Sequence, residues 1–170
     1  MELNQILSED VLKYLIPVKL STRTNSRWQV LNMSPYYRSI DLRVPMEIRL
    51  RARVFLDFHT TFNQITFDLT EEQRSQIETL SNHIRDKAGF VEVKCLKMVT
   101  DKSNYVRIPL LQTKVNSETM CFNKQGQYCD ILDFKRYNLV DITIRSTGLW
   151  CKKDGTIHHL NWDLVSIRNV

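Results

Sequence analysis

Glycine is scarce in this chain of 170 residues, which contains only four. A loop that cradles nucleotide phosphates needs several glycines close together, and neither Gly-x-x-x-x-Gly-Lys-Ser/Thr nor Gly-x-Gly-x-x-Gly occurs. The sequence also lacks Gly-x-Ser-x-Gly, which presents the nucleophile of many hydrolases, and His-Glu-x-x-His, which binds the zinc of metalloproteases. We therefore expect a protein that is not an enzyme and has no small-molecule substrate.

Cysteine and histidine are too few and too scattered to form a zinc site. No Cys-x-x-Cys pair is present, and the adjacent His158 and His159 would point to opposite faces of a strand. Asp130, Asp133 and Asp141 could be imagined as ligands of a divalent metal, but aspartates that cap turns are the commoner arrangement. We expect no metal, no cofactor, and reduced cysteines without disulfides. The four cysteines are Cys95, Cys121, Cys129 and Cys151.

Long apolar segments are missing too. No window approaches the roughly 18 consecutive apolar residues of a membrane-spanning helix, so no transmembrane segment is expected. The first ten residues carry acidic side chains where a secretion signal needs basic ones. A chain of this length with 42% hydrophobic residues suits one folded domain, predicted here as residues 1–170. We expect it inside the cell, nuclear or cytoplasmic, including the cell of a virus-infected host.

The most informative segment runs from Met46 to Leu56, because apolar and other residues alternate strictly along it. The odd-numbered positions are Glu47, Arg49, Arg51, Arg53 and Phe55. This alternation predicts a half-buried strand whose exposed face is a row of three guanidinium groups followed by an aromatic ring. Cations beside aromatic rings are typical of surfaces that bind single-stranded nucleic acid. The alternative is a solvated sheet face whose arginines meet carboxylates on neighbouring strands.

Basic residues are concentrated around this segment. From Lys19 to Phe55 the chain has eight basic residues and two acidic ones, whereas the part from Leu56 to Asp101 is acidic. Seven of the eight are arginines, whose planar guanidinium group suits phosphates and aromatic rings better than an ammonium group does. The local charge favours a binding surface for an anionic partner.

Two further groups of residues are candidates for contact with nucleic acid. Tyr36 and Tyr37 precede Arg38 just before the arginine strand, and stacking of a base on such a ring is worth about 1–3 kcal/mol. Lys152 and Lys153 lie at the tip of the last predicted hairpin, where they could touch a backbone phosphate. The predicted site residues are Arg38, Arg49, Arg51, Arg53, Phe55, Tyr36, Tyr37, Lys152 and Lys153.

The order of elements predicts a mainly β protein with one central helix, over about residues 70–88. Thr70 is a good N-cap, Gln73 stands at the third helical position, and Gly89 suits the C-terminal stop. Before this helix we expect a short helix over residues 3–15, a loop over 21–27, a strand over 28–33, turns at 34–35 and 41–45, the arginine strand, and a strand over 64–69. After it we expect strands near residues 90–99, 105–115, 119–123, 138–151 and 156–167, with Trp150 and Trp162 meeting as a cross-strand pair. The order fits an α+β fold on a curled antiparallel sheet, similar to an oligonucleotide-binding (OB) barrel, or alternatively a β-sandwich with a surface helix.

The C-terminal part resembles a known family. The segments that carry the resemblance are residues 105–115, 121–126, 130–134, 140–150 and 160–167. Their order is similar to that in the C-terminal half of single-stranded DNA-binding proteins from large eukaryotic DNA viruses and virus-like (Polinton-type) transposons. The resemblance implies an OB-like fold that coats replicating DNA without catalysis.

Two functions are therefore open. The first is non-enzymatic binding of single-stranded nucleic acid, with DNA as the expected partner and self-association as a further expectation. The second is a viral structural, matrix or accessory interaction protein whose basic face contacts a membrane or an acidic partner.

Overall fold

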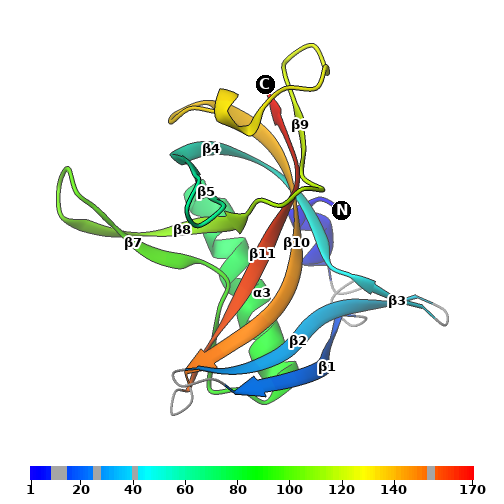
Figure 1. The fold of residues 1–170 in the computed structure, drawn as a ribbon. Coiled ribbons are helices and arrows are strands. Elements are labelled where there is room, and N and C mark those ends of the chain that lie inside the picture. Colours follow the sequence, from blue (N-terminus) through cyan, green and yellow to red (C-terminus); the bar gives the residue numbers. More distant parts are fainter. Residues whose placement is uncertain (9–14, 25–27, 40–41, 153–155) are drawn as a thin grey trace.

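The computed structural model describes residues 1–8, 15–24, 28–39, 42–152 and 156–170, with side chains for residues 1–8, 46–149 and 156–170 (Figure 1). The helices are α1 (Leu3–Ile6), α3 (Glu71–Ala88) and the 3₁₀ helix η1 (Ile131–Asp133). The strands are β1 (Leu15–Thr24), β2 (Trp28–Ser39), β3 (Leu42–Pro45), β4 (Glu47–His59), β5 (Gln64–Asp68), β6 (Glu92–Lys94), β7 (Lys97–Asp101), β8 (Val106–Lys114), β9 (Met120–Phe122), β10 (Leu139–Lys152) and β11 (Ile157–Asn169).

Five of these strands close into a barrel. Antiparallel pairing joins β4 to β5, β5 to β8, β11 to β10, and β10 back to β4, while a short parallel pairing joins β8 to β11. Numbered in chain order, the five strands follow one another around the ring as 1-2-3-5-4. This is the strand order of an OB barrel, so the predicted fold class is confirmed, and the β-sandwich alternative is wrong because the sheet closes on itself.

The long hairpin of β10 and β11 connects the barrel to the remaining strands. On one side, β10 pairs with β4 along its first half and with β2 at its end. On the other side, β11 pairs with β6, β8 and β9 in turn. The register between β10 and β11 shifts after Thr143 and again after Ser146, and such bulges bend a strand and increase its twist. Figure 1 shows β1 and β2 at one end of the molecule and the β7–β8 hairpin extending to the side.

The core occupies the inside of the barrel and the space beside α3. Along β4, buried Ile48, Leu50, Ala52 and Val54 alternate with the exposed arginines, as the strict alternation of the sequence predicts. These residues belong to one cluster of buried side chains that also includes residues of α1, β5, β8, β10 and β11. The predicted half-buried strand is confirmed as far as Val54; beyond the register shift that follows it, Leu56 is exposed and Phe55 is half-buried.

Helix α3 contributes the buried stripe Ile77, Leu80 and Ile84 to this core. Its ends are those predicted from the sequence. The Thr70 hydroxyl accepts a hydrogen bond from the Gln73 backbone N–H, and Gly89 adopts the left-handed conformation, with φ 72°, that ends many helices. No helix in the described part of the chain combines the length and the apolar content that crossing a membrane requires.

Several predictions for the N-terminal part are wrong. Of the helix expected over residues 3–15, the described residues contain α1, and Leu15 belongs to β1 instead; residues 9–14 lie outside the described part. Residues 21–24 of the expected loop belong to β1, and residues 42–45 of an expected turn form β3. The expected turn at Ser34-Pro35 lies inside β2, where Pro35 is opposite Pro17. Pairing in the β1–β2 hairpin outweighs the local turn preference of these residues.

The expected contact between Trp150 and Trp162 is wrong as well. In the β10–β11 ladder Trp150 is opposite His159, whereas Trp162 is opposite Ser146. Trp162 thus lies three residues further along β11 than the partner of Trp150, and sequence alternation alone does not reveal the register in which two strands pair.

Candidate functional site

Two of the three predicted arginines already pair with carboxylates inside the protein. Arg51 binds Asp141, the residue opposite it on β10, through Nε to Oδ1 at 2.8 Å and Nη2 to Oδ2 at 3.1 Å. Hydrogen bonding to the Asp141 side chain and the charge of that carboxylate raise the pKa of Arg51. The Arg49 Nε lies 3.4 Å from Glu2 Oε1. The alternative weighed in the sequence, arginines that meet neighbouring carboxylates, therefore describes Arg49 and Arg51, although exposed pairs of this kind add little stability.

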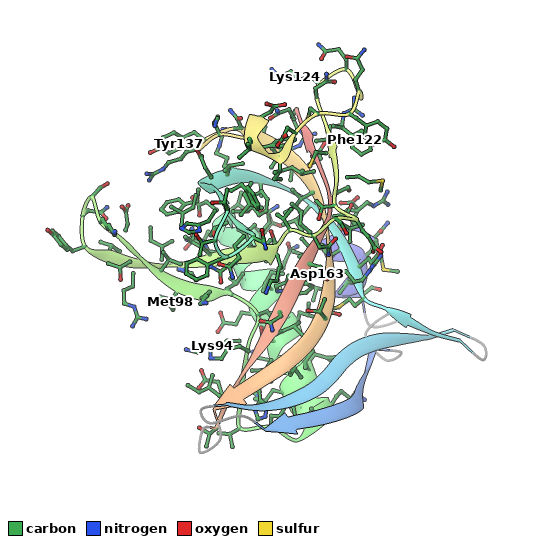
Figure 2. The ribbon with its side chains drawn as sticks, in the orientation of Figure 1. Lys94, Met98, Phe122, Lys124, Tyr137 and Asp163 are labelled. Carbon is green, nitrogen blue, oxygen red and sulfur yellow. The ribbon has the colours of Figure 1, made fainter. Side chains whose placement is uncertain are left out.

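These arginines line a groove of about 700 Å³ that crosses β4, β10 and β11. The strand register places Arg51, Asp141, Arg168 and Phe122 in one row across β4, β10, β11 and β9. The Phe122 ring packs against Tyr128, with ring centroids 5.1 Å apart, and Figure 2 shows Phe122 at this end of the molecule. We call the surface formed by Arg49, Arg51, Arg53, Arg168 and Phe122 the arginine face.

Phe55 follows the arginines on β4 and is already covered on one side by a cation. The Arg136 guanidinium lies 4.8 Å from the centroid of the Phe55 ring and 4.9 Å from that of Tyr137. Arg53 Nη1 donates a hydrogen bond to the Tyr137 carbonyl oxygen at 3.1 Å. Half-buried Phe55 is thus part of a cation–aromatic cluster and offers less ring surface to a base than expected.

The structure does not bring all the predicted site residues together. Tyr36, Tyr37 and Arg38 lie on β2, opposite Pro45, Val44 and Arg43 of β3, and their side chains lie outside the described part. Lys152 ends β10 opposite Trp28, and Lys153 lies outside the described residues. Lys152 is eleven positions along β10 from Asp141, which at about 3.3 Å per residue is on the order of 30 Å from the arginine row.

A second outer surface lies on β5 and β8, the second and third strands of the barrel. Gln64 of β5 is opposite Lys114 of β8. Gln112 of β8 accepts a hydrogen bond from Lys97 Nζ at 3.0 Å. Gln112 and Lys114 alternate along β8 with residues such as Leu111, which point into the core. We call the surface formed by Gln64, Lys97, Gln112 and Lys114 the β5–β8 face.

Exposed aromatic rings lie in two turns that connect to β5 and β8. Phe62, in the turn between β4 and β5, is 61% exposed and packs against His59 with ring centroids 4.9 Å apart. Tyr105, at the tip of the β7–β8 hairpin, is 87% exposed and has a positive φ of 56°. Such rings can stack on bases of any sequence.

Burial shifts the pKa of several titratable groups in and beside the core. Burial lowers the pKa of both His158 and His159, and the charges of Lys94 and Lys97 lower that of His159 further. Burial raises the pKa of the Cys95 thiol to about 12, so this thiol stays protonated at neutral pH. Within the ranges that the structure describes, no group of three or more His, Cys, Asp or Glu side chains could hold a metal ion.

The fold is similar to that of phage single-stranded DNA-binding proteins. The single-stranded DNA-binding protein from bacteriophage Enc34 in complex with ssDNA matches with a TM-score of 0.53 and 13% identity, covering 92% of this chain and 94% of that chain. A second structure of that protein matches with a TM-score of 0.51 and 12% identity, covering 91% and 88%. Its C-terminal truncation gives a TM-score of 0.52 and 12% identity, covering 92% and 93%. No protein-family model and no curated protein sequence matches the chain.

The sequence interpretation missed the residues that the fold brings to the two faces from other strands. Arg168 and Phe122 reach the arginine face only through the pairing of β11 with β10 and β9. Phe62 could have been identified, because it lies between the arginine strand and the strand expected over residues 64–69, where an aromatic ring has no strand face to pack on. Lys97 and Gln112 come from two separate strands, and no spacing in the sequence links them.

Proposed function

We propose that this protein binds single-stranded DNA and catalyses no reaction on it. The observation that carries the proposal is the likeness, over 92% of the chain, to a phage protein described in complex with ssDNA. The 1-2-3-5-4 barrel indicates where such binding would occur, because OB barrels bind oligonucleotides across the second and third strands and in the adjoining loops.

The β5–β8 face is the proposed main contact with DNA. It lies on the second and third strands and on β7, which pairs with the third strand, and it combines two lysines with two amides. The turn that carries Phe62 connects the first and second strands and offers an exposed ring for stacking. Lys152 ends the fourth strand, next to the connection to the fifth strand, which is the other loop that OB barrels use.

The arginine face is the second candidate surface for DNA. It lies on the first, fourth and fifth strands, and its groove contains three arginines and an aromatic ring. Glu2 and Asp141 form ion pairs with two of those arginines, so a phosphate group would have to compete with these carboxylates. For this reason we consider the arginine face a less favourable surface for DNA binding than the β5–β8 face.

A role as a coat protein in DNA replication, in a virus or a virus-like element and inside the host cell, is the narrower part of this proposal. The phage origin of the structural match supports a viral setting in general. The C-terminal resemblance described above is the support for eukaryotic viruses and transposons in particular. The alternative, an interaction protein whose basic face contacts a membrane or an acidic partner, predicts no preference for single-stranded over double-stranded DNA in the same experiment.

The test is a series of fluorescence anisotropy titrations with labelled single-stranded and double-stranded oligonucleotides at several salt concentrations. We expect the single strand to bind more tightly, with log affinity falling linearly against log salt by about 0.7 per phosphate contact. Absence of binding to any single strand would overturn the proposal. Equal binding of both forms would leave only general attraction to nucleic acid and would also contradict it.

Paired variants identify the surface. Changing Lys97 and Lys114 together to glutamine should lower the salt slope by about 1.4 if both contact phosphates. Changing Arg49, Arg51 and Arg53 together to glutamine should lower it by about two if the arginine face is the site, and should leave it nearly unchanged if the β5–β8 face is. Lys87→Gln, at the exposed end of α3, is the control for loss of one positive charge away from both faces.

A further inference from the structure

A cavity of about 310 Å³ opens where β8 separates from β11. The two strands pair only at Trp162 with Thr113 and at Asp163 with Lys114, while the beginning of β11 pairs with β6 instead. Between these two pairings, Leu160 and Asn161 of β11 line the gap. The volume is at the lower end of the roughly 300–1,000 Å³ range of small-ligand pockets, which suits a single ring system.

The lining combines apolar surface with a few polar groups. Leu96 and Leu160 supply the apolar part, and His159, Asn161 and Gln112 supply donors and acceptors. Because the pKa of His159 is lowered, its imidazole is neutral at pH 7, with one donor and one acceptor nitrogen and an uncharged ring. A flat aromatic ligand with hydrogen-bonding edges, such as a nucleobase, matches this combination.

Two lysines border the opening of the cavity. Lys94 Nζ lies 3.7 Å from Glu92 Oε1, a loose and exposed pair, and Lys97 Nζ donates to the neutral Gln112 amide. Neither ammonium group is bound tightly by a carboxylate, so both can donate hydrogen bonds to a phosphate group. In Figure 2, Lys94 lies below Met98 on the side where the β7–β8 hairpin leaves the barrel.

The cavity is continuous with the β5–β8 face, because Lys97 and Gln112 belong to both. We propose that it takes one nucleobase of the bound single strand, with Lys94 and Lys97 holding the phosphates on either side of that base. This inference rests on the proposed function and adds a specific base-binding site to a surface that otherwise contacts any sequence.

The test compares three alanine variants on β11. Asn161→Ala and His159→Ala each remove a polar side chain from the cavity. Asn169→Ala is the control, because it also replaces an asparagine of β11 but at the far end of that strand. We expect the two cavity variants to bind an oligothymidylate at least about fivefold more weakly than wild type, and Asn169→Ala to bind as wild type. The salt slope should stay unchanged in all three because none of these side chains carries a charge, whereas Lys94→Gln should lower it by about 0.7.

A second arm uses an abasic oligonucleotide of the same length, which keeps the phosphates and lacks the bases. Removing the bases should weaken binding by the wild type more than binding by the His159→Ala/Asn161→Ala double variant. The double variant has already lost the contact with the base, so removing the base takes away less. If the cavity variants bind DNA as wild type does, or if base removal costs both proteins equally, the inference is overturned and the proposed function stands. If wild type binds no single strand, the proposed function itself fails.

Discussion

At the scale of single residues, the sequence predicted which side chains are exposed better than it predicted what they contact. Alternation from Met46 to Leu56 placed Arg49 and Arg51 correctly on the outer face of β4. The partner of Arg51, however, is Asp141, 90 residues further along the chain. Alternation depends on the geometry of one strand, whereas the partner depends on which strands pair and in what register.

Trp162 is a residue whose role is structural in this fold. It is 2% exposed, and its indole Nε1 donates a hydrogen bond to the Cys95 carbonyl oxygen at 2.9 Å. Trp162→Ala should lower the free energy of unfolding by about 3–5 kcal/mol, as truncation of large buried side chains does. Trp162→Phe keeps most of the buried area and should cost clearly less. Urea denaturation measures both, and a Trp162→Ala protein as stable as wild type would show that the indole is not part of the core.

The two histidines at the start of β11 should make stability depend on pH. Burial lowers the pKa of His158 and His159 below the usual value near 6.5 that they regain on unfolding. As the pH falls through 6.5, the unfolded chain takes up these protons first, so the free energy of unfolding should decrease with falling pH. Urea denaturation at pH 7.5, 6.5 and 5.5 measures this effect. The His158→Gln/His159→Gln variant should lose stability less steeply over that range, and an unchanged dependence would contradict the assignment.

At the scale of elements, the quality of the prediction followed the strength of local signals. Helix α3 was predicted within about a residue at each end, because Thr70, Gln73 and Gly89 each have a specific role in starting or stopping a helix. Only residues 28–33 of the β1–β2 hairpin were predicted as strand, because Pro17, Pro35 and the polar residues 21–24 gave local signals for turns and loops. Its strands are held by pairing with each other and, at the start of β2, with β10.

Both ends of α3 can be tested by substitution. Thr70→Ala removes the oxygen that accepts from the Gln73 N–H and should cost about 1 kcal/mol. Gly89→Ala should also cost about 1 kcal/mol; no atom lies within 4 Å of the added Cβ, so the cost comes from the positive φ alone. Ser75→Ala, at an exposed position inside the helix, is the matched control and should be neutral or slightly stabilising. Equal stability of all three variants in chemical denaturation would mean that the caps do not stabilise α3.

At the scale of the whole molecule, the decisive feature is the closure of the barrel, which no local pattern encodes. The ring closes through two residue pairs between the parallel strands β8 and β11, about fifty residues apart in the chain. The mainly β character and the central helix were within reach of sequence reasoning, because alternation and capping are local. The two faces of the barrel were not, since the β5–β8 face and the arginine face each combine strands from distant parts of the chain.

One cluster of buried side chains links α1, the barrel and α3, and this leads to a prediction about unfolding. If residues 1–170 form a single domain, no part of the core can open without exposing the rest, so the chain should unfold in one cooperative transition. The three tryptophans report on different regions: Trp162 lies in the core, while Trp28 and Trp150 lie on β2 and β10, where those strands pair. Tryptophan fluorescence and far-ultraviolet circular dichroism should therefore give the same midpoint in urea. Two separated transitions, with Trp28→Phe and Trp150→Phe removing the fluorescence change of one of them, would instead show that the β1–β2 region unfolds independently of the barrel.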